Sequence, residues 1–141
     1  GADEIDYVVN LTKLKAGDTA YIESEMARIT DICREFSVVS KVIFENCYLT
    51  EDEKKTLCHI AAKVKPDFIK TSTGFGTGGA TLEDVALMKK ETEGSGVKIK
   101  AAGGIRTLKT ALEMIDLGVS RIGSTSSVAI MEEYMAHSPL L

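Results

Sequence analysis

Two lysines stand where lysine is unusual, inside short runs of β-forming residues. Lys70 lies in the run 68–72 and Lys100 lies in the run 97–101, and a glycine-bearing turn follows each run. Buried strands rarely carry lysine, because removing an ammonium group from water is costly. A pair of such lysines on successive strands therefore predicts amine chemistry beside an anion-binding site.

The chemistry that two neighbouring lysines can perform is nucleophilic attack on a carbonyl carbon. An unperturbed lysine has a pKa of about 10.4, so only about 0.04% of it is the neutral, reactive amine at pH 7. A second ammonium group nearby penalises the charged form. We assign Lys70 as the attacking amine and Lys100 as the activating charge. The residues alone leave open which lysine attacks, and each could instead reach solvent or pair with a carboxylate.

Asp6 is a third ionisable group that falls inside a predicted strand, at residues 4–10. Forming and dehydrating a carbinolamine requires a proton carrier, often a carboxylate acting through water. The sequence predicts Asp6 as that carrier. The alternative is a purely structural ion pair, for which Lys41 is the candidate partner.

The elements that must position these residues alternate regularly along the chain. Apolar runs predict strands at residues 4–10, 40–45, 68–72, 97–101 and 121–123. Their nearly continuous apolar character is typical of parallel strands covered by helices. Five βα units predict an α/β fold of the (β/α)8 TIM-barrel type, present here as a partial barrel in a single domain of residues 1–141. A complete open sheet is the alternative.

Helices are predicted between the strands, each with a recognisable first residue. The predicted N-caps are Asp18, Thr50, Thr81 and Thr107, and a last helix runs from near Ser126 toward Met135. Thr50 and Glu53 have the spacing of a capping box. The inner face of the first helix is predicted to carry Ile22, Met26, Ile29, Cys33 and Phe36. The tail from His137 to Leu141 is predicted to leave the helical pattern.

Three strand ends have the composition of an anion site. They are the glycine- and hydroxyl-rich turns at residues 73–79, 103–104 and 123–127. Glycine lets backbone N–H groups approach a phosphate, and the helices that follow add partial positive charge. Gly74, Gly76 and Gly79 also fit a dinucleotide-binding fingerprint, but that alternative leaves both strand lysines unexplained.

Composition excludes several other classes of function. A net charge of −4 argues against nucleic-acid binding, and no apolar run approaches the length of about 20 residues that spans a bilayer. The two histidines, His59 and His137, lie away from the predicted strand ends, so no metal or other cofactor is expected. Three cysteines without metal-type spacing and no visible secretory signal predict a cytoplasmic protein with reduced thiols.

Several segments resemble the deoxyribose-phosphate aldolase family of class I aldolases. The most specific are residues 68–75, FIKTSTGF, and residues 100–107, KAAGGIRT, supported by residues 3–8, 41–45 and 121–126. The resemblance covers nearly the whole chain and matches the family's strands four to eight. It implies reversible cleavage of 2-deoxyribose 5-phosphate to glyceraldehyde 3-phosphate and acetaldehyde, without metal.

The resemblance also implies roles for individual residues. Lys70 would form the Schiff base, Lys100 would be the second lysine, and Asp6 would relay protons. Thr73 would lie near the sugar. The residues implied to hold the phosphate are Gly74, Gly103, Gly104, Gly123, Thr125 and Ser126.

The main departure from the family is that nothing in the chain matches its first three βα units. An uncovered sheet with free edges predicts self-association or a complementing N-terminal chain. Besides catalysis, two alternatives remain open: a non-catalytic half-barrel that binds phosphate, and a different Schiff-base (β/α)8 enzyme such as a transaldolase-like protein.

Overall fold

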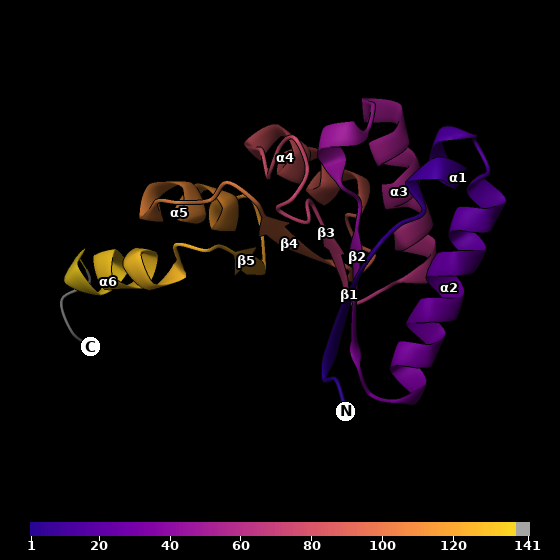
Figure 1. The fold of residues 1–141 in the computed structure, drawn as a ribbon, viewed down its shortest axis with the longest axis horizontal. Coiled ribbons are helices and arrows are strands. Elements are labelled where there is room, and N and C mark those ends of the chain that lie inside the picture. Colours follow the sequence, from indigo (N-terminus) through magenta and orange to yellow (C-terminus); the bar gives the residue numbers. More distant parts are fainter. Residues whose placement is uncertain (138–141) are drawn as a thin grey trace.

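The computed structural model describes residues 1–137, so residues 138–141 of the predicted tail lie outside the described residues. His137 was wrongly assigned to that tail, because it is the last residue of the final helix. Strands and helices alternate along the chain (Figure 1). In order they are β1 (Glu4–Val8), α1 (Leu11–Lys15), α2 (Thr19–Glu35), β2 (Val39–Ile43), η1 (Asn46–Tyr48), α3 (Glu51–Val64), β3 (Phe68–Lys70), α4 (Leu82–Glu91), β4 (Lys98–Ala102), α5 (Leu108–Asp116), β5 (Arg121–Gly123) and α6 (Ser127–His137). None of the helices within residues 1–137 is long and apolar enough to span a membrane.

The five strands form one parallel sheet in the order β1-β2-β3-β4-β5. This order never reverses, as a doubly wound sheet would, and it is the order of a (β/α)8 barrel. Glu4 of β1 and Arg121 of β5 nevertheless form an ion pair across the sheet. On a flat sheet four strand spacings would separate them by about 19 Å. The sheet is therefore strongly curved, with an inner and an outer face.

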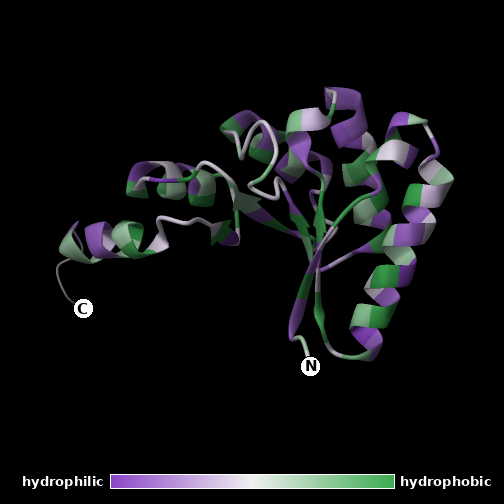
Figure 2. Cartoon of the chain, in the orientation of Figure 1, coloured by the Kyte–Doolittle hydropathy of each residue, from purple (hydrophilic) through white to green (hydrophobic). Residues whose placement is uncertain are grey.

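The two faces of the sheet carry different side chains. On the outer face, Val42, Ile69 and Ile99 are at most 1% exposed and belong to the apolar core under the helices. Figure 2 shows hydrophobic residues along the strands and alternating hydrophobic and hydrophilic bands along α2. On the inner face, β3 presents Lys70 in direct register with Lys100 of β4. Because successive side chains of a strand point to opposite faces, the apolar and the ionisable side chains are separated.

The helix starts predicted from the sequence are confirmed. The side chains of Asp18, Thr50, Thr81 and Thr107 each accept a hydrogen bond from a backbone N–H in the first turn of their helix. Thr50 also completes the predicted capping box with Glu53. These caps satisfy backbone donors that would otherwise lack partners.

The sequence missed two short elements and misplaced one side chain. Asn10, predicted to end the first strand, instead caps α1 by accepting from the N–H of Lys13, and η1 was not predicted. Phe36 was wrongly assigned to the buried face of α2. It is the residue that follows the last turn, and it is 69% exposed.

Both edges of the described sheet are apolar and uncovered. Beside β1, the exposed side chains are Ile5, Ile32 and Phe36. At the opposite end of the molecule, α5 and α6 lie side by side (Figure 1) and enclose, with β5, an apolar groove of about 470 Å³. The exposed Ile115 and Met131 line this groove. Apolar surfaces of this kind are typical of sites where further protein packs.

Candidate active site

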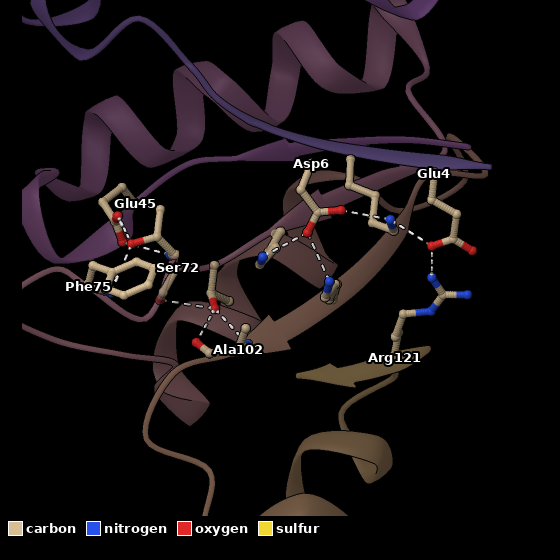
Figure 3. Close-up of polar contacts among 12 residues, drawn as sticks. Glu4, Asp6, Glu45, Ser72, Phe75, Ala102 and Arg121 are labelled. Carbon is tan, nitrogen blue, oxygen red and sulfur yellow. Dashed lines mark hydrogen bonds and ion pairs between the residues drawn. The ribbon is translucent and has the colours of Figure 1, made fainter. Parts of the chain in front are cut away.

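Two lysines and one aspartate meet on the inner face of the sheet (Figure 3). Lys70 donates from Nζ to Asp6 Oδ2 at 2.7 Å, and Lys100 donates from Nζ to the same oxygen at 2.9 Å. The two nitrogen atoms can therefore lie no farther apart than the sum of these distances. The structure thus brings together the three ionisable residues that the sequence singled out.

Asp6 is also connected to a second group of charged residues on the sheet. Lys41 Nζ lies 2.7 Å from Asp6 Oδ1 and 2.7 Å from Glu4 Oε2. Arg121 Nη1 donates to the same oxygen of Glu4 (Figure 3). Lys41, considered from sequence as the alternative partner of Asp6, is thus bound together with the other two lysines. The connected group contains four cations and two carboxylates, which leaves the inner face with excess positive charge.

The hydrogen bonds fix the charge of the two carboxylates. Burial raises the pKa of Asp6, but the hydrogen bonds from its three lysines outweigh burial and hold this pKa well below 3.8. Hydrogen bonds from Arg121 and Lys41 lower the pKa of Glu4 to about 2. Burial lowers the pKa of Lys41, yet its bonds to both carboxylates leave that pKa raised above 10.5. Asp6 is therefore ionised at neutral pH.

A pocket of about 400 Å³ opens above the lysines, where β3, β4 and β5 end. Most of the candidate residues from the sequence line it, namely Lys70, Thr73, Gly74, Lys100, Gly103, Gly104, Gly123 and Thr125. Carboxyl ends of parallel strands are the edge where (β/α)8 proteins hold their active sites. The three glycine-bearing turns therefore converge on one pocket, as predicted.

Two candidate residues do not line this pocket. Asp6 is absent from the pocket lining but is bound to Lys70 and Lys100, which belong to it. Ser126 donates its backbone N–H to Ser124 Oγ at 2.9 Å, so it supports the turn from outside. Each of these residues is one hydrogen bond away from a residue that does line the pocket.

The structure adds Ser124 and Arg106 to the pocket wall. Ser124 lies inside the predicted hydroxyl-rich turn, and its Oγ donates to the carbonyl of Ile105 at 2.6 Å. Arg106 follows the glycine pair of the second turn and is exposed. Arg106 could have been predicted from the sequence, because it is a cation close to a glycine turn. Ser124 could not, because the sequence does not show which serine of a turn faces the pocket.

The glycines of these turns have identifiable physical reasons. Gly74, Gly103 and Gly104 have φ angles of 95°, 89° and 77°, which disfavour any other residue. A Cβ atom on Gly79 would lie 2.2 Å from the carbonyl oxygen of Gly103, so two turns of the pocket touch through backbone. A Cβ on Gly76 would lie 2.8 Å from Cys47 Sγ. Packing thus accounts for the glycine spacing without a dinucleotide.

Comparison with known proteins gives related chains of known name. Deoxyribose-phosphate aldolase of Lactobacillus acidophilus is 57% identical over 132 residues, which are 94% of this chain and 55% of that protein. The solved structure of an aldolase, QR15, has a TM-score of 0.87 and 44% identity and is matched over 96% of this chain and 60% of its own. Deoxyribose phosphate aldolase of Aeropyrum pernix, described as having a unique tetrameric structure, has a TM-score of 0.83 at 27% identity, over 98% of this chain and 57% of its own.

The matches cover almost all of this chain, but the chain spans little more than half the length of the relatives. The structural neighbours are TIM-barrel aldolases, and the chain corresponds to only part of that barrel. Residues 1–125 match the sequence pattern of the DeoC/LacD family of aldolases. Together with the strand order and the paired lysines, these matches confirm the resemblance drawn from the sequence: the chain belongs to the DeoC/LacD aldolase family.

Proposed function

We propose that the chain carries the catalytic part of a class I aldolase. Its reaction is the reversible cleavage of 2-deoxy-D-ribose 5-phosphate to D-glyceraldehyde 3-phosphate and acetaldehyde. The observation that carries this proposal is the convergence of Lys70 and Lys100 on one oxygen of Asp6, beside the pocket where three glycine-bearing turns meet. Relatives that bear the name deoxyribose-phosphate aldolase support the choice of substrate.

In this mechanism the neutral amine of Lys70 attacks the aldehyde carbon, and the carbinolamine loses water to give an iminium ion, the Schiff base. The C2–C3 bond then breaks as the C3 hydroxyl gives up its proton, and the bonding electrons form an enamine. Protonation at C2 and addition of water release acetaldehyde and free the amine. Asp6, being ionised, accepts protons in these steps, and the ammonium group of Lys100 donates them.

The glycine-bearing turns are proposed to hold the phosphate. Backbone N–H groups of glycine-bearing turns and the partial charge of a helix N-terminus suit a phosphate dianion. The proposed phosphate-binding residues are Gly74, Gly103, Gly104, Gly123, Thr125 and Ser126, with Thr73 beside the sugar. The excess positive charge of the inner face adds a longer-range attraction for the anionic substrate.

We also propose that the domain of residues 1–141 works with further βα units. The uncovered edges beside β1 and β5 and the apolar groove between α5 and α6 offer places for them. These units can come from an N-terminal segment, from a complementing chain or from a second copy that covers the same edges. Pairing would satisfy the free edge strands and bury their apolar side chains.

The test is reductive trapping of the Schiff base. The chain is incubated with deoxyribose 5-phosphate or with acetaldehyde in the presence of borohydride, and the intact mass and modified peptide are measured. We expect an adduct on Lys70, its loss in Lys70→Leu, and its retention in Lys98→Leu. Lys98 is a matched control, because it shares β4 and the inner face with Lys100 but does not line the pocket.

The alternative function is phosphate binding without catalysis, and the uncovered inner face is the observation that favours it. Saturable binding of deoxyribose 5-phosphate without any trapped adduct would support this alternative. The trapping is then repeated after adding the first three βα units of a close relative. An adduct that appears only in that mixture would assign catalysis to the completed barrel, and its continued absence would contradict the aldolase proposal.

A further inference from the structure

Glu45 is a buried carboxylate that the proposed mechanism leaves without a role. It is 5% exposed and lies directly after Ile43 and Phe44, where β2 ends. Its φ angle of 57° is in the left-handed region, which is unfavourable for a residue with a side chain. Such a conformation persists only where the surroundings enforce it, and it is often found at functional sites.

Both carboxylate oxygens of Glu45 are bound by a single residue of the pocket wall (Figure 3). The backbone N–H of Thr73 donates to Oε1 at 3.0 Å, and the hydroxyl of Thr73 donates to Oε2. Among residues 1–137 no cation forms an ion pair with this carboxylate. The hydrogen-bonding capacity of Glu45 is therefore directed at the turn that follows β3.

The contact with Glu45 fixes more of the turn than Thr73 itself. Because the hydroxyl proton of Thr73 points to Glu45, its oxygen is free to accept, and it accepts the N–H of Phe75 at 3.0 Å. A Cβ atom on Gly76 would lie 3.3 Å from Glu45 Oε1, so the backbone of the turn passes directly over the carboxylate. Glu45 thus holds residues 73–76 from beneath.

A negative charge on Glu45 is unfavourable beside a pocket proposed to bind an anion. A carboxylate at this place therefore indicates a specific task. Its carboxylate does not line the pocket, whereas Thr73 and Gly74, which cover it, do. Hydrogen bonds to a charged acceptor are stronger than those between neutral groups, so a carboxylate holds this turn more firmly than an amide or a hydroxyl would. The arrangement gives a rigid turn at the cost of some repulsion.

We propose that Glu45 is a positioning residue, which holds the turn of Thr73 and Gly74 against the phosphate-bearing end of the substrate. The proposal rests on the proposed function for the identity of that substrate. Its consequence is selective: Glu45 determines the affinity for deoxyribose 5-phosphate but has little influence on acetaldehyde, which carries no phosphate for this turn to bind.

The first measurement is backbone hydrogen exchange at Thr73 and Phe75, which needs no substrate. In Glu45→Ala the N–H of Thr73 loses its acceptor, and the hydroxyl that accepts the N–H of Phe75 is no longer held in place. We expect both amides to exchange at least about tenfold faster. Glu45→Gln keeps one acceptor oxygen and is expected to give an intermediate rate. Asp84→Ala is the control, because Asp84 is a buried carboxylate that pairs with Lys54 away from the pocket.

The second measurement is borohydride trapping on Lys70 with each aldehyde in turn. For Glu45→Ala we expect the half-saturating concentration of deoxyribose 5-phosphate to rise about tenfold, with trapping of acetaldehyde unchanged within about twofold. Equal losses with both aldehydes, or unchanged exchange at Thr73 and Phe75, would overturn the proposal. If neither aldehyde is trapped, even after the first three βα units of a relative are added, the proposed function fails, and hydrogen exchange still decides whether Glu45 holds the turn. Glu45→Gln serves if Glu45→Ala does not fold.

Discussion

The two faces of the sheet differ most sharply at neighbouring residues of one strand. Ile69 points outward into the helix-covered core and is fully buried, whereas Lys70 points inward to Asp6. Burial of an apolar side chain is a direct source of stability. A partly buried ion pair contributes little net stability, because desolvation offsets the attraction between the charges. Stability and the proposed chemistry therefore lie on opposite faces of the same β-strands.

The largest expected effect is that substitutions at these two neighbours change different properties, one the stability and the other the trapped adduct. Ile69→Ala removes a fully buried side chain and should lower the free energy of unfolding by about 3–4 kcal/mol. It should leave the borohydride-trapped adduct in place below the unfolding transition. Lys70→Met should abolish the adduct and change stability by less than about 1.5 kcal/mol. Urea denaturation and intact mass measure the two quantities on each variant.

A result in which both variants lose stability and adduct to the same extent would contradict this separation. It would mean that the inner face contributes to the cooperative core. Lys41→Met serves as a further control on the inner face, because Lys41 is buried like Lys70 but does not line the pocket.

The second effect concerns the carboxylate at the centre of the inner face. Asp6→Asn leaves three lysines around a neutral amide, and removing one partner of a buried pair is costly. The side chain of Asp6 is 26% exposed, so solvent reduces the loss to about 2 kcal/mol. Lys41→Met should cost less, because two other lysines still bind Asp6. If Lys41→Met proved the more damaging variant in urea, packing rather than charge would dominate this face.

The third effect is a loss of stability in acid to which the carboxylates of the inner face contribute. The pKa of Glu4 is lowered from 4.5 to about 2 in the folded chain, so the unfolded state binds protons more readily. Stability from Glu4 is therefore present above pH 4.5 and is lost as the pH falls toward 2. Asp6 acts in the same direction. We expect Glu4→Gln to flatten the dependence of unfolding free energy on pH between 5 and 2.

The outer-face variant Ile69→Ala is the control for this measurement. It should lower stability at every pH without changing the slope, because it removes no titratable group. An unchanged slope in Glu4→Gln would assign the acid sensitivity to carboxylates elsewhere, such as the caps of the outer helices.

The parts of the fold that follow from local patterns could be predicted from the sequence. The side-chain requirements of an N-cap are contained within four residues, so Asp18, Thr50, Thr81 and Thr107 were placed correctly. The placement of Lys70 and Lys100 on successive strands followed from the β-forming residues around each of them. What failed were features set by chain segments far apart, such as the exposure of Phe36 beside an uncovered edge.

The candidate site shows the same limit. The sequence identified the glycine turns because their composition is local, and it named Lys41 as a possible partner of Asp6, as the structure confirms. It could not reveal that Glu4 and Arg121 complete the charge network. Their contacts depend on the curvature of the sheet, which brings Arg121 back to Glu4 across 117 residues. Glu45 was missed for a similar reason, because its partner Thr73 is 28 residues away on the next unit.

The smallest expected effect compares a small enlargement of one side chain on each face. A Cβ on Gly123 would lie 3.0 Å from the Cβ of Ala102 and 3.5 Å from Cε of Lys100, but the pocket is open on its other side. Gly123→Ala should therefore lower the free energy of unfolding by less than about 1 kcal/mol. On the closed outer face, Ala101 is fully buried, and Ala101→Val should cost about 2 kcal/mol in the same urea experiment. An equal or larger loss in Gly123→Ala would mean that the inner face is packed as tightly as the core, and the distinction between the faces would then rest on charge alone.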